Sequence, residues 1–194
     1  MPHDIEDLKR SLVSLGASQT AHLDVDLLAH MTNVYLTLDR MARPEHVVLA
    51  GLFHGVYGTH ALNGTQVFAL HDTRRAEVRD MIGERAEQVV YRFCAMTYES
   101  VGRSVRLMLR GKNPELWDRC TNAPLPATPE EFEELLWVKL ADLLAHVPQL
   151  PNGARDGVVT ALGPFWQLVA EHLGPPAIEE WNAVFFDSIP ITAH

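Results

Sequence analysis

A nearly unbroken apolar segment, PEHVVLAGLF at residues 44–53, places the strongest constraint on how this chain folds. Pro44 suits the first turn of a helix, and Glu45 is favourable near the positive end of the helix dipole. Because the segment has almost no polar face, it predicts a helix that lies inside the fold. His54 follows immediately, beside a glycine-containing loop. A histidine at that point is either a ligand for a bound group or a core side chain hydrogen-bonded to a neighbour.

The composition restricts the class of protein. The chain has 194 residues, of which 47% are hydrophobic, and this suits one globular domain. Its net charge of −9 argues against a nucleic-acid partner, since binding to phosphates relies on excess positive charge. The apolar runs are too short to span a membrane, and the N-terminus does not resemble a signal peptide, so a cytoplasmic protein is expected. The two cysteines imply no disulfide framework, and Cys94 is expected to be buried.

Hydrophobic periodicity and helix-capping residues predict helices along most of the chain. The predicted ranges are 4–15, 24–41, 44 to about 56, 73–81, 84–99, 128–147, 156–173 and 177–186. Residues 101–110 either continue the fifth helix or fray, and residues 61–72 form either a short strand or an irregular loop. Residues 111–127 are rich in Gly, Pro and Asn and predict a long loop. The chain is therefore expected to form a single all-α domain over residues 1–194.

Several of these helices resemble the HD-domain superfamily, and most closely the hydrolase domain of the stringent-response alarmone enzymes. LLAHMTNVYLTL resembles the helix with the family's first metal-binding histidine, here His30. VLAGLFHGVYGT resembles the helix that ends in the His-Asp doublet, with His54 as the histidine, and uncharacterised HD-like proteins carry a similar GLFHxxYGT stretch. LLWVKLADLLAHV resembles the last metal-binding helix, with Asp142 as its aspartate. The resemblance covers about residues 22–147 and implies an HD-like fold on which the helices of residues 156–187 pack.

The resemblance implies a divalent transition-metal site formed by His30, His54 and Asp142. Two imidazoles and one carboxylate suit Fe(II), Mn(II) or Zn(II) and leave positions for water and substrate. An alternative is an outward-facing Asp142 paired with Lys139 or His146.

The chain departs from the family pattern beside the second histidine. Gly55 stands where the doublet has its aspartate, and Gly58-Thr59 replaces the acidic pair of the alarmone hydrolases. The second departure argues against alarmone hydrolysis. His22 and His60 are candidates to replace the lost carboxylate, and the alternative for each is an exposed loop histidine. A glycine at position 55 predicts a rebuilt, mononuclear site.

Further residues are candidates for the chemistry at this site. Asp142 or His60 is expected to accept a proton from metal-bound water, and Tyr57 to donate a hydrogen bond to a bound oxygen. Arg74 and Arg75 are candidates to bind an anionic substrate, or else they pair with neighbouring acidic residues on a solvated surface.

Three functions from different classes are consistent with these features. The first is a metal-dependent enzyme that hydrolyses a small phosphorylated or amide-type substrate. The second is an iron-dependent HD-type oxygenase that uses a two-His-one-carboxylate site. The third is a non-catalytic HD domain that binds a ligand or partner. The aromatic side chains near the C-terminus are expected to fill the core or a homodimer contact.

Overall fold

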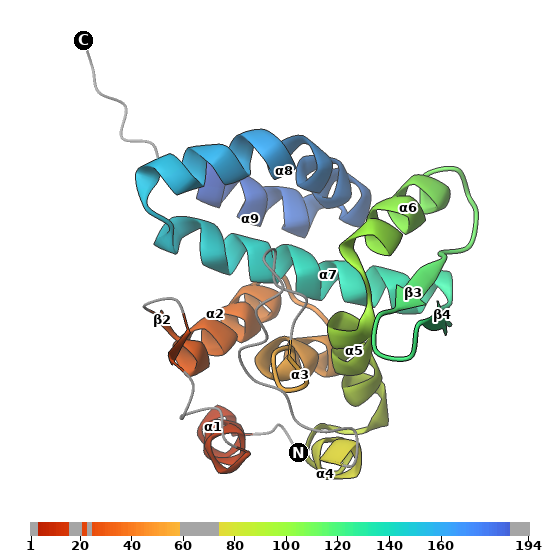
Figure 1. Cartoon of the computed structure of the whole chain (residues 1–194). Coiled ribbons are helices and arrows are strands. Elements are labelled where there is room, and N and C mark those ends of the chain that lie inside the picture. Colours follow the sequence, from red (N-terminus) through yellow and green to blue (C-terminus); the bar gives the residue numbers. More distant parts are fainter. Residues whose placement is uncertain (1–3, 16–20, 23–24, 59–73, 187–194) are drawn as a thin grey trace.

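The computed structural model of the protein describes residues 4–15, 21–22, 25–58 and 74–186. Helices dominate these residues, which confirms the predicted all-α fold class (Figure 1). The helices are Ile5–Ser14 (α1), Leu27–Arg40 (α2), Glu45–Phe53 (α3), Arg75–Ile82 (α4), Glu84–Ala95 (α5), Tyr98–Met108 (α6), Pro129–His146 (α7), Asn152–Leu173 (α8) and Pro175–Phe185 (α9). The strands Ala21–His22 (β1) and Val25–Asp26 (β2) form one short antiparallel pair, and Leu116–Asp118 (β3) and Ala123–Leu125 (β4) form another. None of the helices in the described ranges is long and apolar enough to cross a bilayer.

Helix α7 lies in the middle of the molecule. Helices α2, α3 and α5 pack on one side of it, and the α8–α9 pair packs on the other (Figure 1). Its start is defined by a capping box, in which the Thr128 side chain accepts from the backbone N–H of Glu131 and the Glu131 carboxylate accepts from that of Thr128. Because α7 touches both layers, most of its residues are buried, and its polar side chains need partners from the neighbouring helices.

Helices α2 and α3 approach each other closely at Gly51. A Cβ atom at this position would lie 2.3 Å from Cδ1 of Leu38 and 3.3 Å from Cγ1 of Val34. A side chain at residue 51 would therefore push the two helices apart, whereas glycine lets them meet. As predicted from the sequence, α3 is interior, and every residue from Val47 to Phe53 is buried. This contact fixes the relative position of the helix that carries His30 and the turn that carries His54.

The start of α2 differs from the prediction. The helix begins at Leu27 rather than at residue 24, because the backbone of Val25 and Asp26 pairs with β1 instead of entering the helix. Residue 24, where the helix was predicted to begin, lies outside the described residues, as does the ambiguous segment 61–72.

Residues 84–127 also differ from the prediction. The fifth helix ends at Ala95, because Met96 adopts an extended conformation and Thr97 caps a new helix, α6. The predicted loop 111–127 contains the β3–β4 hairpin. Asp118 accounts for this hairpin, since its Oδ1 atom accepts from the backbone N–H groups of Cys120 and Thr121 and so forms a turn.

The C-terminal helices form a pair that covers α7. Helix α8 starts at Asn152, earlier than the predicted residue 156, and contains Pro164. Trp166 and Trp181 are buried between these helices and the rest of the core. On α9, Glu180 also receives two hydrogen bonds from Arg40 of α2. The C-terminal aromatic residues thus largely fill the core, although Phe186 is 59% exposed.

Candidate metal centre

Asp142 of α7 lies at the centre of a group of three histidines. Its Oδ1 atom is 3.1 Å from Nε2 of His30, 3.6 Å from Nε2 of His54 and 3.5 Å from Nε2 of His146. The side chains of His30, His54 and Asp142 are only 4%, 3% and 16% exposed, whereas that of His146 is 43% exposed. The structure therefore brings together three predicted ligands from three separate segments and adds a third histidine, His146, at the solvent side.

The local sequence explains how each side chain reaches this point. His30 precedes Met31 on α2 and lies beside the buried stripe of that helix. His54 is the first residue after α3 and keeps a helical backbone conformation, so its ring turns back along the helix. His146 is four residues after Asp142, a spacing that places both side chains on one face of α7.

The protonation state of His54 is determined by its neighbours. Its Nδ1 atom is 2.7 Å from the carbonyl oxygen of Gly51, which can only accept, so Nδ1 carries the hydrogen. Burial lowers the pKa of His54 to about 4, and the ring is therefore neutral near pH 7. A neutral ring protonated on Nδ1 presents the lone pair of Nε2 to Oδ1 of Asp142. Two hydrogen-bond acceptors thus face each other at 3.6 Å.

Asp142 is ionised despite its burial. Burial alone would raise the pKa of this carboxyl group, but the hydrogen bond with His30 and the positive charge of Lys139 hold it well below its usual range. The two carboxylate oxygens have different surroundings. Oδ1 faces the imidazoles, and Oδ2 lies 3.6 Å from Nζ of Lys139.

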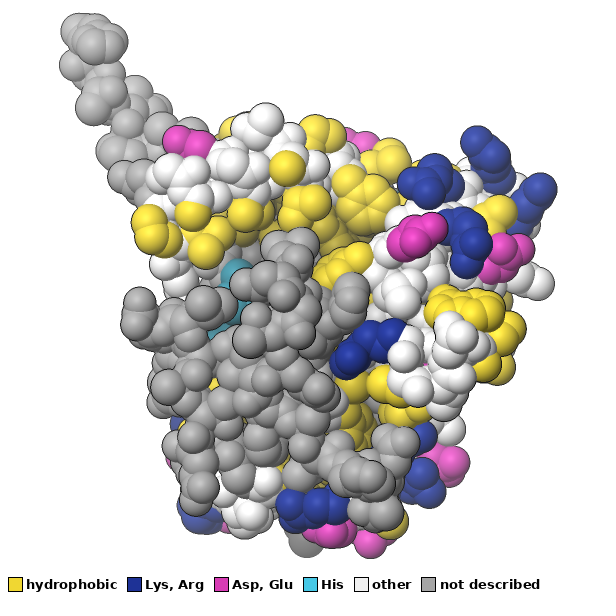
Figure 2. All heavy atoms as spheres, viewed as in Figure 1, with side chains coloured by type: hydrophobic (Ala, Val, Ile, Leu, Met, Phe, Trp, Pro, Cys, Tyr) yellow, Lys and Arg dark blue, Asp and Glu magenta, His cyan; other side chains and the backbone are white. Residues whose placement is uncertain are grey.

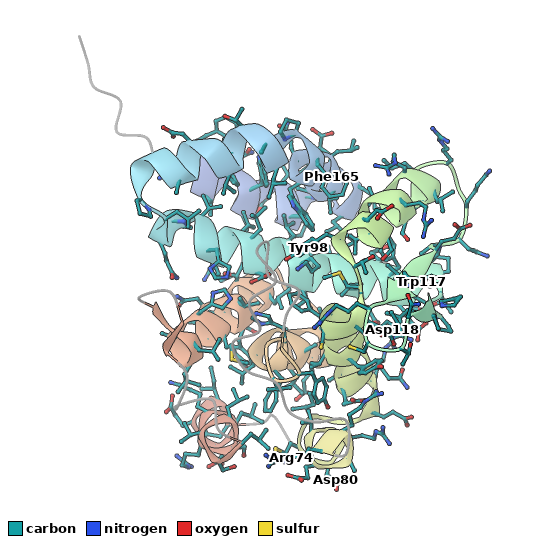
Figure 3. All side chains as sticks on the ribbon, in the orientation of Figure 1. Arg74, Asp80, Tyr98, Trp117, Asp118 and Phe165 are labelled. Carbon is teal, nitrogen blue, oxygen red and sulfur yellow. The ribbon has the colours of Figure 1, made fainter. Side chains whose placement is uncertain are left out.

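Lys139 is held in place by aromatic residues. Its side chain is 3% exposed, and Nζ lies 4.0 Å from the ring centre of Phe93 and 4.6 Å from that of Tyr98. It also donates a hydrogen bond of 3.3 Å to the hydroxyl oxygen of Tyr98, which lies beside α7 at the start of α6 (Figure 3). The ammonium group is therefore held beside Oδ2 of Asp142, whereas the three histidines lie near Oδ1.

The histidine rings pack on one another. His30 stacks on His146 with ring centres 3.9 Å apart, and it meets His54 edge-on at 5.2 Å. Among the described residues, Nδ1 of His30 is buried and has no hydrogen-bond partner. In Figure 2, histidine surface is visible at the edge of the residues whose placement is uncertain, below hydrophobic side chains of the α8 layer.

The donor atoms lie close enough together to bind one metal ion. One ligand atom from each of His30, Asp142 and His146 lies within 4.8 Å of the others. With metal–ligand bonds of about 2.0–2.2 Å, two ligands of the same ion lie roughly 3–4 Å apart. The distances of 3.1, 3.5 and 3.6 Å from Oδ1 of Asp142 to the three Nε2 atoms are in this range. The cluster could thus hold a metal ion.

Other predicted site residues belong to a separate cluster around Glu87 of α5. The Tyr57 hydroxyl group donates to Glu87 at 3.0 Å, and Arg75 donates to both carboxylate oxygens at 2.6 and 3.0 Å. Arg74 pairs with Glu77 on the surface of α4, which agrees with the alternative of a solvated helix face. The structure therefore groups Tyr57 and Arg75 with Glu87 and not with the histidines.

The side chains of two predicted ligands, His22 and His60, are not among those that the structure describes. His60 lies outside the described residues, and His22 is described only as part of strand β1, without its side chain. The structure also brings a further candidate ligand to the group, His146, which the sequence indicated only as a surface partner of Asp142. Its spacing of four residues from Asp142 was the available signal, because this spacing aligns side chains on a helix.

Gly55 has room for a side chain. A Cβ atom there would lie 3.5 Å from Cε of Met31 and 3.9 Å from Cδ1 of Leu27, both ordinary contact distances. The Cβ atom of a side chain at this position would therefore point towards the apolar residues of α2.

The chain is similar to one family of proteins over part of its length. The model of a family described as a domain of unknown function (DUF6817) matches residues 11–97. This range contains α2, α3 and α5, with His30, His54 and Glu87, but it ends before α7 and thus before Asp142 and His146. No curated protein and no solved structure matches the chain.

Proposed function

We propose that the protein is a metal-dependent hydrolase that holds one divalent ion through His30, His54, Asp142 and His146. The observation that carries this proposal is the pair of acceptors formed by Nε2 of His54 and Oδ1 of Asp142. A lone pair and a carboxylate that face each other at 3.6 Å repel unless a proton or a cation lies between them. Burial disfavours the extra proton on His54, so a metal ion is the better counterpart.

The number of protein ligands bears on the choice of ion. Four protein ligands would fill a tetrahedral Zn(II) site, and closed sites of this kind are structural rather than catalytic. An ion that accepts five or six ligands, such as Mn(II) or Fe(II), would retain positions for water and substrate on the same four groups. A bound ion of this type would lower the pKa of a coordinated water and polarise a substrate oxygen.

The residues of the chain have distinct parts in this proposal. Lys139 holds Oδ2 of Asp142 and leaves Oδ1 for the ion, as neighbouring groups commonly do around metal ligands. His146 is the most exposed of the four groups, so water and substrate would reach the ion from its side.

The charge balance favours an anionic substrate. The charges of Asp142 and Lys139 cancel, so a divalent ion would leave a positive centre beneath the surface. A small phosphorylated compound suits such a centre better than a neutral amide. The HD-like scaffold belongs to the same proposal, since the three segments that resemble the HD-domain superfamily bring His30, His54 and Asp142 together.

A second candidate function is a binding domain without metal or catalysis. It is favoured by the observation that Asp142 already has a hydrogen bond with His30 and a cation, Lys139, nearby. In that case the histidine cluster would be a structural ion-pair network, and it would bind metal no better than scattered surface histidines do.

Metal titration of the parent protein and its variants separates the two candidates. After dialysis against a chelator, the parent should bind about one Mn(II) or Fe(II) per chain in calorimetry, and binding should raise its thermal midpoint. His54→Ala and His146→Ala should each lower the affinity about tenfold or more. His172→Ala, which removes an exposed histidine of α8, should leave it unchanged and serves as the matched control.

Catalysis needs its own measurement. Under anaerobic conditions, the metal-loaded parent should hydrolyse p-nitrophenyl phosphate, and Asp142→Asn should not. Metal binding without any hydrolysis would favour a binding domain, and equal metal affinity in the parent and both histidine variants would contradict the metal site itself. Turnover that requires oxygen would instead support the oxygenase.

A further inference from the structure

The two cysteines of the chain lie beside one antiparallel contact between the end of α5 and the β3–β4 hairpin. Met96 and Asp118 form an antiparallel bridge, and the backbone N–H of Arg119 donates to the carbonyl oxygen of Ala95 at 2.8 Å. Cys94 immediately precedes Ala95 at the end of α5, and Cys120 immediately follows Arg119, so the two cysteines lie beside this contact. The Cys120 thiol is close enough to the Cys94 thiol to interact with it, and a disulfide requires Cα atoms about 4.4–6.8 Å apart.

Several hydrogen bonds hold the two cysteine-bearing segments together. Thr97 donates its backbone N–H to the carbonyl oxygen of Trp117 at 3.2 Å, and the Arg119 side chain donates to the carbonyl oxygen of Cys94 at 2.8 Å. Asp118 accepts from the backbone N–H of Cys120 at 2.7 Å. Figure 3 shows Trp117 and Asp118 on the hairpin beside α5. Cys120 is therefore kept against the end of α5 by both backbone and side-chain contacts.

The surroundings of the two thiols differ in a way that suits a two-step reaction. Cys120 is exposed, whereas Cys94 is 3% exposed and donates its S–H to the carbonyl oxygen of Tyr57 at 2.9 Å. Burial raises the pKa of the Cys94 thiol to about 12, and the adjacent Cys120 thiol is one of the groups that contribute. The Arg119 guanidinium lies 3.4 Å from Sγ of Cys94 and would stabilise a thiolate there.

We propose that Cys94 and Cys120 are a dithiol site that is converted to an intramolecular disulfide by a small-molecule disulfide such as oxidised glutathione. Cys120 attacks the reagent, so that one sulfur–sulfur bond breaks, a mixed disulfide forms at Cys120, and one reduced glutathione leaves. Cys94 then loses its proton and attacks Sγ of Cys120, which releases the second glutathione. The protein loses two electrons and two protons, and the reagent gains them. This site is independent of the metal-dependent activity proposed above.

The disulfide would have a structural consequence at a defined place. It would link the β3–β4 hairpin covalently to the end of α5, and it would remove the S–H donor from the carbonyl oxygen of Tyr57. Crosslinking residues 94 and 120 constrains the unfolded chain, so the oxidised protein should unfold at a higher temperature than the reduced protein.

Oxidation of the native protein by glutathione tests this assignment. The reduced protein is incubated with oxidised glutathione, then unfolded in the presence of an alkylating reagent and analysed by intact mass spectrometry and a non-reducing gel. The expected product is a monomer that has lost two hydrogen atoms, carries no glutathione and takes up no alkylating reagent. A chain that keeps glutathione on Cys120 with Cys94 still reduced would overturn the proposal, as would a covalent dimer or an unreacted protein.

Two variants identify the step that each cysteine performs. Cys94→Ala should accumulate the mixed disulfide at Cys120, because the second thiol is absent. Cys120→Ala should remain reduced under the same conditions, since Cys94 is buried. Rapid modification of Cys94 in the Cys120→Ala protein would overturn the order of the two steps.

Discussion

Two carboxylates of the described residues, the fully buried Glu87 and the largely buried Asp142, have sharply different surroundings. Glu87 is fully buried and receives hydrogen bonds from Tyr57 and from two nitrogen atoms of Arg75. Arg75 also lies over the ring of Tyr91, with its guanidinium carbon 3.7 Å from the ring centre. Every group that faces Glu87 in these contacts is a donor, so its charge is compensated within the protein.

Asp142 has a different set of neighbours. One oxygen lies near Lys139, but the other faces imidazole nitrogens, and the nitrogen of His54 has its lone pair towards it. Donors surround Glu87, whereas Asp142 has one acceptor, Nε2 of His54, beside the partners His30 and Lys139. The comparison favours a structural role for the Glu87 cluster, and the Asp142 cluster could hold a cation. The sequence analysis grouped Tyr57 and Arg75 with the histidines because they lie near one another in the chain, and the structure shows both hydrogen-bonded to Glu87.

The largest expected effect comes from removing Glu87. Glu87→Ala leaves Arg75 without its partner in a partly buried position, and breaking a buried ion pair in this way costs about 3–5 kcal/mol. Denaturant unfolding of the chelated protein should show a loss of this order. The metal affinity of the folded variant should equal that of the parent, and a large loss of affinity would mean that the two clusters are one functional unit.

Asp142→Asn should mainly affect metal affinity, whereas Glu87→Ala mainly affects stability. The amide retains the shape of the side chain but removes the charge that a metal ion requires, so metal affinity should fall by about a hundredfold or more, as calorimetry would measure. Asp80→Asn, on the exposed surface of α4, is the matched control and should bind metal like the parent. If Asp142→Asn binds metal within twofold of the parent, Asp142 is not a metal ligand, and the proposed difference between it and Glu87 is wrong.

Two glycines near the histidines offer a matched test of packing. Gly51→Ala places a Cβ atom 2.3 Å from Leu38, and relief of that overlap should cost about 1–3 kcal/mol of stability. The Gly55→Ala Cβ atom meets Met31 only at 3.5 Å, so this change should cost much less. Thermal unfolding should rank the variants in this order. Equal stability would show that the contact between α2 and α3 does not depend on Gly51.

A smaller effect is expected from pH in the chelated protein. The pKa of His54 is lower in the folded protein, about 4, than the value of about 6.5 expected for the unfolded chain. The unfolded state therefore binds more protons between these values, and stability falls as the pH decreases from about 6.5 towards 4. Unfolding measured across this range should have a steeper pH dependence in the parent than in His54→Gln. Identical slopes would imply that His54 is already protonated in the folded state.

The smallest effect is expected at Arg74. This residue pairs with Glu77 on the surface of α4, and exposed pairs of this kind contribute little. Arg74→Ala should leave the thermal midpoint, the metal affinity and the hydrolysis of p-nitrophenyl phosphate unchanged. A rise in KM for that substrate at constant kcat would instead indicate that Arg74 contacts the substrate.

The sequence by itself determined the helical framework. The apolar run of residues 47–53 predicted a buried helix, and the Thr128-Pro129-Glu130-Glu131 start of α7 is a local signal that survives intact in the structure. Local signals of this kind depend on propensity, capping and periodicity, all of which act within a few residues. These local signals predicted the structure less well where the backbone pairs with a distant segment, as at Met96 and Asp118.

The tertiary structure decided which polar residues share a site. His54 and Tyr57 are three residues apart, yet one side chain meets Asp142 and the other meets Glu87. His146 joins the histidines because α7 crosses α2 and is turned so that Asp142 and His146 both face His30. The contact that brings Cys94 near Cys120 likewise depends on a hairpin that local patterns did not predict. These pairings depend on helix crossing and backbone register, which involve residues far apart in the chain and leave no local pattern in the sequence.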